Sequence, residues 1–506
     1  MASVARGPRA PCIIGVGRRT WHPGDVGPEG APEPLRMWEQ VAREAAADAG
    51  APGALGGLGS LDVVYCQAWQ YDDPPGRLAE QLGAAPPRSR YSGIGGSVPQ
   101  VLVAEAAEAV AAGNLDLGLV VGGEALATVR RLKKAGSRPA WSHRPAERRP
   151  FPFDVPFHPA EVAHSVFEAF LTFALFDTAR RGHLGRTIDQ HRARIGPLLA
   201  RMTEIAAADP ANAWFPIARR PAEIVEPTAD NRLVAYPYTK LMTSIMDVDM
   251  AAAVLVASDA KADELGVPAD RRVYLRGWGY ARDPDHVAER RDLWRSAAMV
   301  AASRAALGGA GIGPDDVTHF DLYSCFASSL SFALDALRVD HDPFLTGERA
   351  VTVTGGLPYH GGPGSSYMTH SLAAMAERLR ADPGTYGLVS GVGMHMTKHA
   401  YGLWSTEPGP FTPPDLAVLA EEVRADQELV AIIDTAEGRA TVATFSVLHG
   451  RDGSPEWGAL VCDLPDGTRC YARMEDPDAL ADAEREDLVG RTVTLVTHDG
   501  VNRATL

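Results

Sequence analysis

The stretch VTVTGGLPYHGGPGSSYMTH, residues 351–370, carries the strongest signal for the fold of this 506-residue chain. Glycine loses much conformational entropy when it is fixed in a helix or strand, and proline lacks a backbone N–H donor. The glycines and prolines of this stretch therefore predict a loop rather than the interior of a regular element. The tyrosines and histidines within it add groups that can hydrogen-bond and exchange protons.

Two chemically rich segments flank this loop. Residues 318–330 (THFDLYSCFASSL) predict a short apolar strand that runs into a helix of small residues. Residues 386–400 (YGLVSGVGMHMTKHA) predict another strand, which ends in a glycine turn. An open α/β sheet brings the ends of its strands to one crevice, so we expect the active site where these three segments meet.

The composition excludes several classes of protein. An apolar content of 45% over 506 residues is enough for two to four globular domains. The net charge of −15, with RRLKK (residues 130–134) as the one basic block, argues against nucleic acid or an anionic membrane as the main partner. We interpret RRLKK as a solvated helix face; the alternative is contact with a phosphate-bearing cofactor, since the block closely follows a strand end.

The sequence also lacks the marks of export and of metal binding. No window approaches the roughly 18 uninterrupted apolar residues of a membrane span, and residues 1–17 contain no apolar core of signal-peptide length. Five scattered cysteines without a C-x-x-C pair predict free thiols rather than disulfides or a zinc site. We therefore expect a cytoplasmic protein with no membrane span.

Strands and helices alternate in the same order in two parts of the chain. The first part reads as a strand (12–21), a helix (35–48), a strand (61–69), a glycine turn (93–97), a buried alanine-rich helix and a strand (115–125). The second part reads as a strand (273–281), a helix (292–307), a strand, the glycine loop, a helix (371–381) and a strand (387–393). Two copies of one unit predict a duplicated α/β fold.

Two regions interrupt this alternation. Residues 137–230 begin proline-rich and continue as helices, which we interpret as a lid over the sheet. Prolines between 408 and 414 mark a linker, and the alternating strands beyond it predict a small closed, OB-like β barrel. The predicted domains are residues 1–136 (first half), 137–230 (helical lid), 231–405 (second half) and 415–506 (barrel).

Four motifs in this order resemble the thiolase superfamily: GGEA (122–125), MDVDMAAAVLVAS (246–258), GGLPYHGGPG (355–364) and SGVG (390–393). The match is closest to thiolase-like proteins allied to sterol-carrier-protein-associated thiolases, which are often called acetyl-CoA acetyltransferases and can carry an extra C-terminal β domain. The resemblance covers about residues 10–405. It implies a duplicated five-layer αβαβα fold, an acyl-CoA substrate with coenzyme A as part of that substrate, no covalently bound cofactor, and a homodimer, with a monomer as the alternative.

The sequence departs from the family at both catalytic cysteines. Thiolases use a cysteine on the turn that opens the first buried helix, where this chain has SGIGGSVPQ (92–100). The second cysteine, in a Cys-x-Gly near the end, falls in GVGMHM (391–396) and is also missing. The histidine of the family's Gly-His-Pro motif maps approximately onto His360, and the residue that begins the second-half motif maps onto Tyr323. The usual thiolase reaction through two cysteines is therefore not expected.

The candidate site residues follow from these positions. A neutral imidazole or a phenol in a dry pocket can stabilise an oxyanion or exchange a proton, and glycine-rich turns offer backbone donors. Histidines 395 and 399 lack the helical context of a zinc motif, so no metal site is predicted. The predicted catalytic residues are Tyr323, Cys325, His360, Tyr367 and His399. The predicted substrate-binding residues are Gly95, Gly96, Ser97, Gly361, Gly362, His370 and Gly393.

Several of these residues have a simpler structural interpretation. Ser97 at a helix start is typical of an N-cap, Cys325 is typical of a small buried apolar residue, and the two tyrosines could be core residues with backbone partners. Three functions stay open: acyl transfer on acyl-CoA without the standard nucleophile, retro-aldol cleavage of a β-hydroxyacyl-CoA by tyrosine and histidine, and binding of acyl-CoA or lipid without catalysis.

Overall fold

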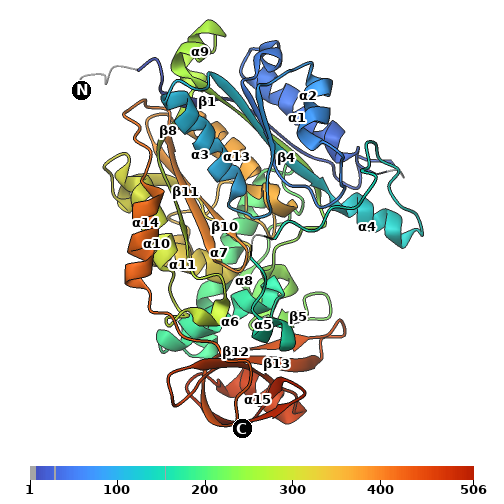
Figure 1. Ribbon diagram of the computed structural model, residues 1–506, viewed down its shortest axis with the longest axis vertical. Coiled ribbons are helices and arrows are strands. Elements are labelled where there is room, and N and C mark those ends of the chain that lie inside the picture. The colour runs from blue at the N-terminus through green and yellow to red at the C-terminus, as the bar shows by residue number, and fades with distance from the viewer. Residues whose placement is uncertain (1–6, 28–29, 154) are drawn as a thin grey trace.

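The computed structural model describes residues 7–27, 30–153 and 155–506, which form an α/β body with a small β barrel packed at one end (Figure 1). The body contains a nine-stranded sheet in the order β3-β2-β4-β7-β1-β8-β11-β10-β9. The strands of the first half are β1 (Pro11–Thr20), β2 (Ser60–Val63), β3 (Arg88–Tyr91), β4 (Leu117–Ala125) and β7 (Asp249–Ser258). Those of the second half are β8 (Val273–Arg282), β9 (Val317–Asp321), β10 (Tyr386–Gly393) and β11 (Lys398–Ser405).

The two halves of the sheet repeat one pairing scheme. In the first half β7 is antiparallel to both β1 and β4, and β4 is parallel to β2. In the second half β11 is antiparallel to both β8 and β10, and β10 is parallel to β9. Strands β1 and β8 join the halves through only two residue pairs. This repetition confirms the predicted duplication.

A G-x-G sequence in the first strand of each half explains how a helix packs so closely on each sheet. A Cβ at Gly15 or Gly17 of β1 would collide with backbone oxygens of α1 (Pro34–Asp48). A Cβ at Gly277 or Gly279 of β8 would collide with backbone oxygens of α10 (Ala297–Gly308) in the same way. Only glycine permits this approach of backbone to backbone.

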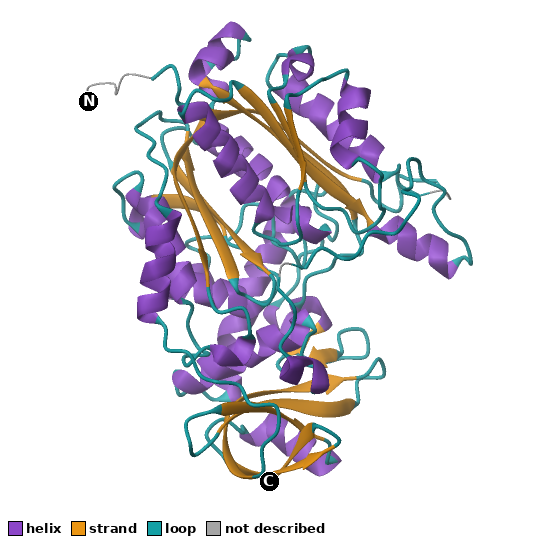
Figure 2. Ribbon diagram, in the orientation of Figure 1, coloured by secondary structure: helices purple, strands orange, loops and turns teal. Residues whose placement is uncertain are grey.

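The helices complete five layers, which Figures 1 and 2 show side by side. The outer layers contain α1, with α2 (Pro74–Leu82), on one side and α10, with α11 (Ala327–Leu337) and α14 (Leu416–Asp426), on the other. The central layer contains α3 (Val98–Ala111) and α13 (Tyr367–Ala381), which contact each other and both halves of the sheet. Because α3 is apolar around most of its circumference, it can be buried between the two. The predicted αβαβα arrangement is confirmed.

The remaining helices lie outside these layers. Helix α4 (Leu126–Lys134) carries the RRLKK block, and α9 (Asp259–Glu264) follows β7. The region predicted as a lid contains α5 (Pro159–Ala163), α6 (Ala169–His183), α7 (Ile188–Ala208) and α8 (Pro221–Val225). A short helix, α12 (Asp342–Thr346), precedes the glycine-rich loop and contacts α7.

The C-terminal strands close into a five-stranded barrel in the order β12-β13-β14-β16-β15-β12, with β14 and β16 parallel. Its elements are β12 (Gly438–His449), β13 (Pro455–Asp463), β14 (Arg469–Met474), α15 (Pro477–Glu486), β15 (Thr492–His498) and β16 (Val501–Thr505). A parallel pair in a five-stranded Greek-key barrel is typical of the OB-fold, which confirms the predicted barrel.

The structure also changes three details of the prediction. Helix α13 begins at Tyr367, one turn before the predicted start at residue 371, so the end of the glycine-rich stretch is helical. Helix α10 begins at Ala297 rather than at 292, because the hydroxyl of Ser296 caps it by accepting from Met299 N. The hairpin of β5 (Leu233–Ala235) and β6 (Tyr238–Thr239), expected in the second half of the α/β body, extends the barrel sheet beside β12.

Candidate functional site

The three segments expected to form a site meet at the N-terminus of α3. The phenol oxygen of Tyr323, just after β9, lies so close to Gly96 that a Cβ there would collide with it. The same Cβ would collide with the carbonyl oxygen of Val392 in β10. Gly95 N donates to the hydroxyl of Ser365, at the entrance to α13, over 3.0 Å. Strand ends of the second half therefore meet the helix start of the first half.

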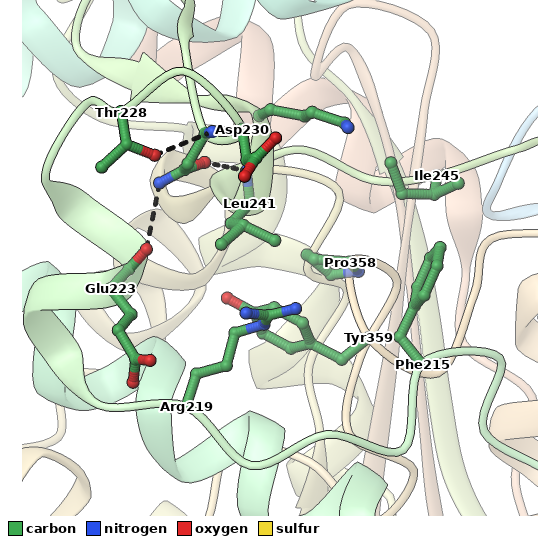
Figure 3. Close-up of a pocket in the computed structure, with 11 residues that line it drawn as sticks. Phe215, Arg219, Glu223, Thr228, Asp230, Leu241, Ile245, Pro358 and Tyr359 are labelled. Carbon is green, nitrogen blue, oxygen red and sulfur yellow. Dashed lines mark hydrogen bonds between the residues drawn. The ribbon is translucent and has the colours of Figure 1, made fainter.

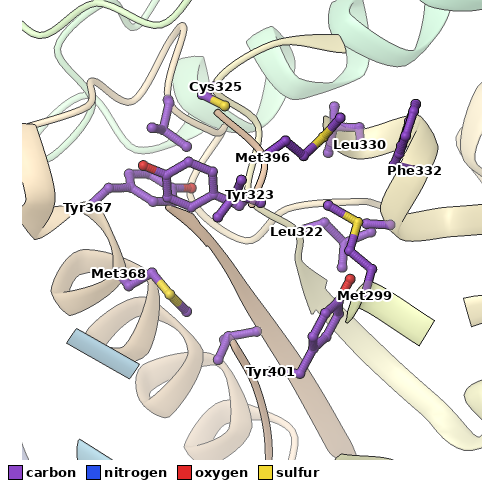
Figure 4. Close-up of a cluster of buried hydrophobic side chains, with 14 of the residues drawn as sticks. Met299, Leu322, Tyr323, Cys325, Leu330, Phe332, Tyr367, Met368, Met396 and Tyr401 are labelled. Atoms are coloured by element: carbon purple, nitrogen blue, oxygen red, sulfur yellow. The ribbon is translucent and has the colours of Figure 1, made fainter. Parts of the chain in front are cut away.

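Four aromatic side chains form a continuous row beside this junction. The rings of Tyr323 and Tyr367 meet edge to face at 5.6 Å between centroids, and Figure 4 shows them side by side. The ring of His360 lies 6.1 Å from that of Tyr367, and the ring of His370 lies 5.3 Å from that of His360. All four residues are at most 6% exposed. The structure thus brings together four of the predicted site residues.

The two histidines of this row are held neutral. Burial, with a smaller effect from Arg18, lowers the pKa of His360 to about 3. Burial also lowers the pKa of His370 well below its ordinary value. Among the described residues, neither ring nitrogen of either histidine has a hydrogen-bond partner. Buried polar atoms are almost always paired in folded proteins, so these four ring nitrogens could pair with a bound molecule.

A buried carboxylate, that of Asp321, is hydrogen-bonded to the row through Tyr367. The sequence analysis did not identify this residue. Its Oδ2 accepts from the hydroxyl of Tyr367 at 3.0 Å, and its Oδ1 accepts from the hydroxyl of Thr352 at 2.6 Å and from Val353 N at 3.1 Å. The hydroxyl of Thr354 lies 2.7 Å from that of Tyr367. Burial raises the pKa of Asp321 and raises that of Tyr367 well above its ordinary value, so the pair can hold and pass a proton.

Cys325 lies at the edge of the same cluster (Figure 4). Its thiol donates to the hydroxyl of Ser329 over 3.7 Å, and burial raises its pKa to about 12. A thiol with such a pKa is almost entirely protonated near neutrality and is a poor nucleophile. This geometry favours the structural interpretation of Cys325.

The predicted glycine and serine positions line the junction. Ser97 precedes α3 and is 2% exposed, but its hydroxyl makes no capping hydrogen bond. Gly393 faces Ser97, since a Cβ at Gly393 would lie 3.1 Å from the serine Oγ. In the glycine-rich loop, Gly361 packs against Met250 and Gly362 N donates to Ile245 O over 2.9 Å.

The structure places His399 away from this group. Its Nε2 lies 3.0 Å from Asp283 Oδ2, and Asp283 also accepts from Ser296 and Ala298 at the start of α10. His399 therefore faces the outer helix layer, whereas the neighbouring Lys398 faces Gly393 and the central layer. Burial would raise the pKa of Asp283, but Arg290 and the hydrogen bond from His399 outweigh burial and hold that pKa at about 2. His399 thus belongs to a separate buried ion network.

A cavity of about 420 Å³ lies beside the glycine-rich loop (Figure 3). Pro358 and Tyr359 form one wall, and the carbonyl of Tyr359 accepts from Phe215 N over 2.9 Å. Two cationic residues, Arg219 and Lys240, and two acidic residues, Glu223 and Asp230, also line the cavity. Tyr359, which lines this cavity, directly precedes His360 in the chain.

The part of the chain that the structure describes contains neither a candidate metal site nor a candidate membrane-spanning helix. There, no group of three or more histidine, cysteine, aspartate or glutamate side chains is arranged to hold a metal ion. In the same residues, no helix combines the length and apolar character needed to span a bilayer.

Comparison with known proteins identifies the family. The crystal structure of a monomeric SCP2-thiolase-like protein type 1 from Mycobacterium smegmatis aligns with a TM-score of 0.85 and 30% sequence identity, over 99% of this chain and 100% of that one. This chain belongs to the SCP2-thiolase-like family. Residues 419–501 match the model of the additional C-terminal domain of thiolase-like protein type 1.

More distant structures share the fold of this SCP2-thiolase-like protein. Acetyl-CoA acetyltransferase from Syntrophomonas wolfei aligns at 16% identity and a TM-score of 0.57, over 79% of this chain and 99% of that one. An Ltp2-ChsH2(DUF35) aldolase aligns at 16% identity and a TM-score of 0.58, over 79% and 98%. No curated protein sequence matches the chain.

Proposed function

We propose that this SCP2-thiolase-like protein cleaves a β-hydroxyacyl-CoA by a retro-aldol reaction. The observation that carries the proposal is the hydrogen-bonded pair of Asp321 and Tyr367, in ring contact with a neutral, unpaired His360. A retro-aldol step needs a base for the β-hydroxyl proton and a donor for the thioester oxygen, on which negative charge develops. The pair and the histidine supply these two functions.

The reaction can be written with these residues alone. Tyr367 accepts the proton of the β-hydroxyl as its own proton passes to Asp321. The bond between the α and β carbons breaks, the β carbon becomes a ketone or aldehyde, and the electron pair moves into the thioester as an enolate. His360 donates a hydrogen bond to the enolate oxygen, and Tyr323 protonates the α carbon. The cycle closes when Asp321 releases its proton and Tyr323 regains one.

Acyl transfer is supported less well by the same residues. It requires a nucleophile, and the pKa of the Cys325 thiol, raised to about 12 by burial, leaves it protonated. The hydroxyl of Ser97 would need an adjacent base to act as a nucleophile, and in the structure it makes no hydrogen bond even as a helix cap. Binding of acyl-CoA without turnover is the second candidate, favoured by the complete burial of His360.

The decisive experiment follows ketone or aldehyde release from a branched β-hydroxyacyl-CoA, with acetyl-CoA and acetoacetyl-CoA in parallel and the protein mass recorded. We expect product without a mass increase, and a fall in kcat of about a hundredfold in Tyr323→Phe, because a positioned proton donor is lost. Tyr401→Phe is the matched control: Tyr401 is a buried phenol of the same hydrophobic cluster (Figure 4), and its hydroxyl has no partner among the described residues.

Two outcomes would contradict the proposal. An acyl adduct on the protein would support a transferase. Tight binding of all three thioesters without any product, unchanged in both variants, would support a binding protein.

A further inference from the structure

A second, larger cavity lies on the first half of the body, at the end of β2 and α4. Its volume is about 1350 Å³, and residues 65–70 and 129–151 line it. The cationic residues among them are Lys133, Arg138, Arg144, Arg148 and Arg149. No aspartate or glutamate is among the lining residues, although the chain as a whole carries a net charge of −15.

These cations are not neutralised by neighbouring acids. Within the described ranges 7–27, 30–153 and 155–506, none of the five forms an ion pair with a carboxylate, whereas many arginines elsewhere in the chain do. Five like charges around one concave surface repel one another and attract an anion of high charge. Guanidinium groups also match the geometry of phosphate oxygens.

The wall that carries these arginines is held in place by specific contacts. The side chain of Gln70 exchanges two hydrogen bonds with the backbone of Arg149, at 3.1 and 2.9 Å, and the Trp69 indole donates to Ser142 O over 2.9 Å. Trp69 packs edge to face on Trp141, and the guanidinium of Arg144 lies 5.8 Å above the ring of Trp69. The cavity therefore combines anchored cations with an aromatic surface on which a planar base can stack.

A line of aromatic rings runs from this cavity to the turn that follows β10. Tyr65 contacts Phe151, and ring contacts continue from Phe151 to Phe153, to Phe157 and to His395, with centroids 4.6–5.8 Å apart. Phe151 and Phe153 are 44% and 48% exposed, which is unusual for such large apolar side chains. His395 belongs to the turn after Gly393, which faces Ser97 at the start of α3.

We propose that the cavity formed by residues 65–70 and 129–151 binds the nucleotide polyphosphate end of the acyl-CoA, and that the aromatic line guides the rest of the molecule towards Tyr323. The identity of the bound molecule rests on the proposed function. The existence of an anion site does not rest on the proposed function, because these arginines can bind an anion without any turnover. The smaller cavity beside Tyr359 is left for the acyl part.

The test measures equilibrium binding by calorimetry with the full chain, using coenzyme A, adenosine 3′,5′-bisphosphate and pantetheine. For Arg144→Ala with Arg148→Ala, we expect the affinity for coenzyme A and for the bisphosphate to fall about tenfold for each cation removed. Binding of pantetheine, which carries no phosphate, should be unchanged. Higher salt should weaken wild-type binding of the two phosphate-bearing ligands.

Lys134→Ala is the matched control, because Lys134 is exposed on the same helix as Lys133 but does not line the cavity. It should bind all three ligands like the wild type. Thermal melting of each variant identifies loss of fold.

The proposal is overturned if the double variant is folded and binds coenzyme A as the wild type does. Absence of turnover in the wild type, with nucleotide binding intact and sensitive to the arginines, would contradict the proposed reaction and leave this site standing.

Discussion

Glu124 in the first half of the duplicated sheet and Asp321 in the second are both buried carboxylates at a strand end, and they have different partners. Glu124, at the end of β4, accepts from the backbone N–H groups of Gln67 and Ala68 at 2.7 and 2.9 Å. Asp321, at the end of β9, accepts mainly from side-chain hydroxyls, among them that of Tyr367. Both residues are fully buried.

This difference separates a structural acid from a reactive one. A backbone N–H does not give up its proton near neutral pH. The third donor to Glu124 is the Cys66 thiol, over 3.4 Å, and burial raises the pKa of this thiol well above its ordinary value, so it also keeps its proton. The bonds to Glu124 therefore fix the segment after β2 in place. A phenol can transfer its proton, and Tyr367 is in ring contact with His360. Burial raises the pKa of both carboxyls, so the partners, and not the pKa direction, distinguish the two sites.

The largest expected effect comes from Asp321→Asn. The amide keeps the size of the side chain and one acceptor for the Tyr367 hydroxyl, but it cannot take up the proton at neutral pH. We expect kcat for cleavage of a β-hydroxyacyl-CoA to fall by about 10²–10⁴-fold, the usual contribution of a positioned acid–base group. The same assay on Glu124→Gln is the matched control. Equal losses of kcat in the two variants would show that Asp321 and Glu124 do not differ in function.

A smaller effect is expected on stability, and it concerns Glu124. Burial raises the pKa of this carboxyl from 4.5 to about 7 in the folded chain. Between these pH values the folded state binds more protons than the unfolded state, so the free energy of unfolding falls as the pH rises from 4.5 through 7. A shift of this size corresponds to about 3 kcal/mol, since one pKa unit is worth about 1.4 kcal/mol.

Glutamine at position 124 removes this titration. The free energy of unfolding of Glu124→Gln, relative to wild type, should therefore increase by about 3 kcal/mol between pH 4 and pH 8, as measured by urea unfolding at each pH. The fixed cost of placing an amide against two N–H donors is the same at every pH and drops out of the comparison. A difference that stays constant with pH would show that folding does not change the pKa of Glu124.

The sequence was sufficient for the fold because the fold depends on local signals. The alternation of strands and helices, the buried alanine-rich helix and the turns of the barrel each leave a local pattern in the sequence, and the meeting of strand ends follows from topology. Asp321 was missed because its three hydroxyl partners lie 31 to 46 residues further along the chain. An aspartate at the end of a strand is otherwise typical of solvent-exposed turns.

The position of His399 and the existence of the cationic cavity could not be predicted from the sequence, for equally physical reasons. His399 was grouped with the site by its chemistry, but neighbouring residues of a strand face opposite sides, and the side on which Lys398 lies is the one that faces Gly393. The cationic cavity combines Lys133 of the RRLKK block with four arginines from the following loop. A loop without periodic pattern gives no indication of where its side chains converge.

The smallest effect is expected on the mass of the protein in solution, and it concerns the edge of the sheet in the first half. The first half ends in the edge strand β3, whose Arg88 and Arg90 pair with Asp62 and, for Arg90, with Glu105 of the same chain. Charged side chains on an exposed strand oppose pairing with a second copy. We therefore expect a mass of 53.9 kDa by light scattering, the monomer rather than the homodimer typical of thiolases. Arg88→Thr with Arg90→Thr should raise the mean mass only slightly at high concentration, because the carboxylate of Asp62, in the neighbouring strand β2, then lacks its two cations. A wild-type mass of twice the chain mass, unchanged by salt, would contradict this expectation. It would show that two copies associate through β3 or through another face.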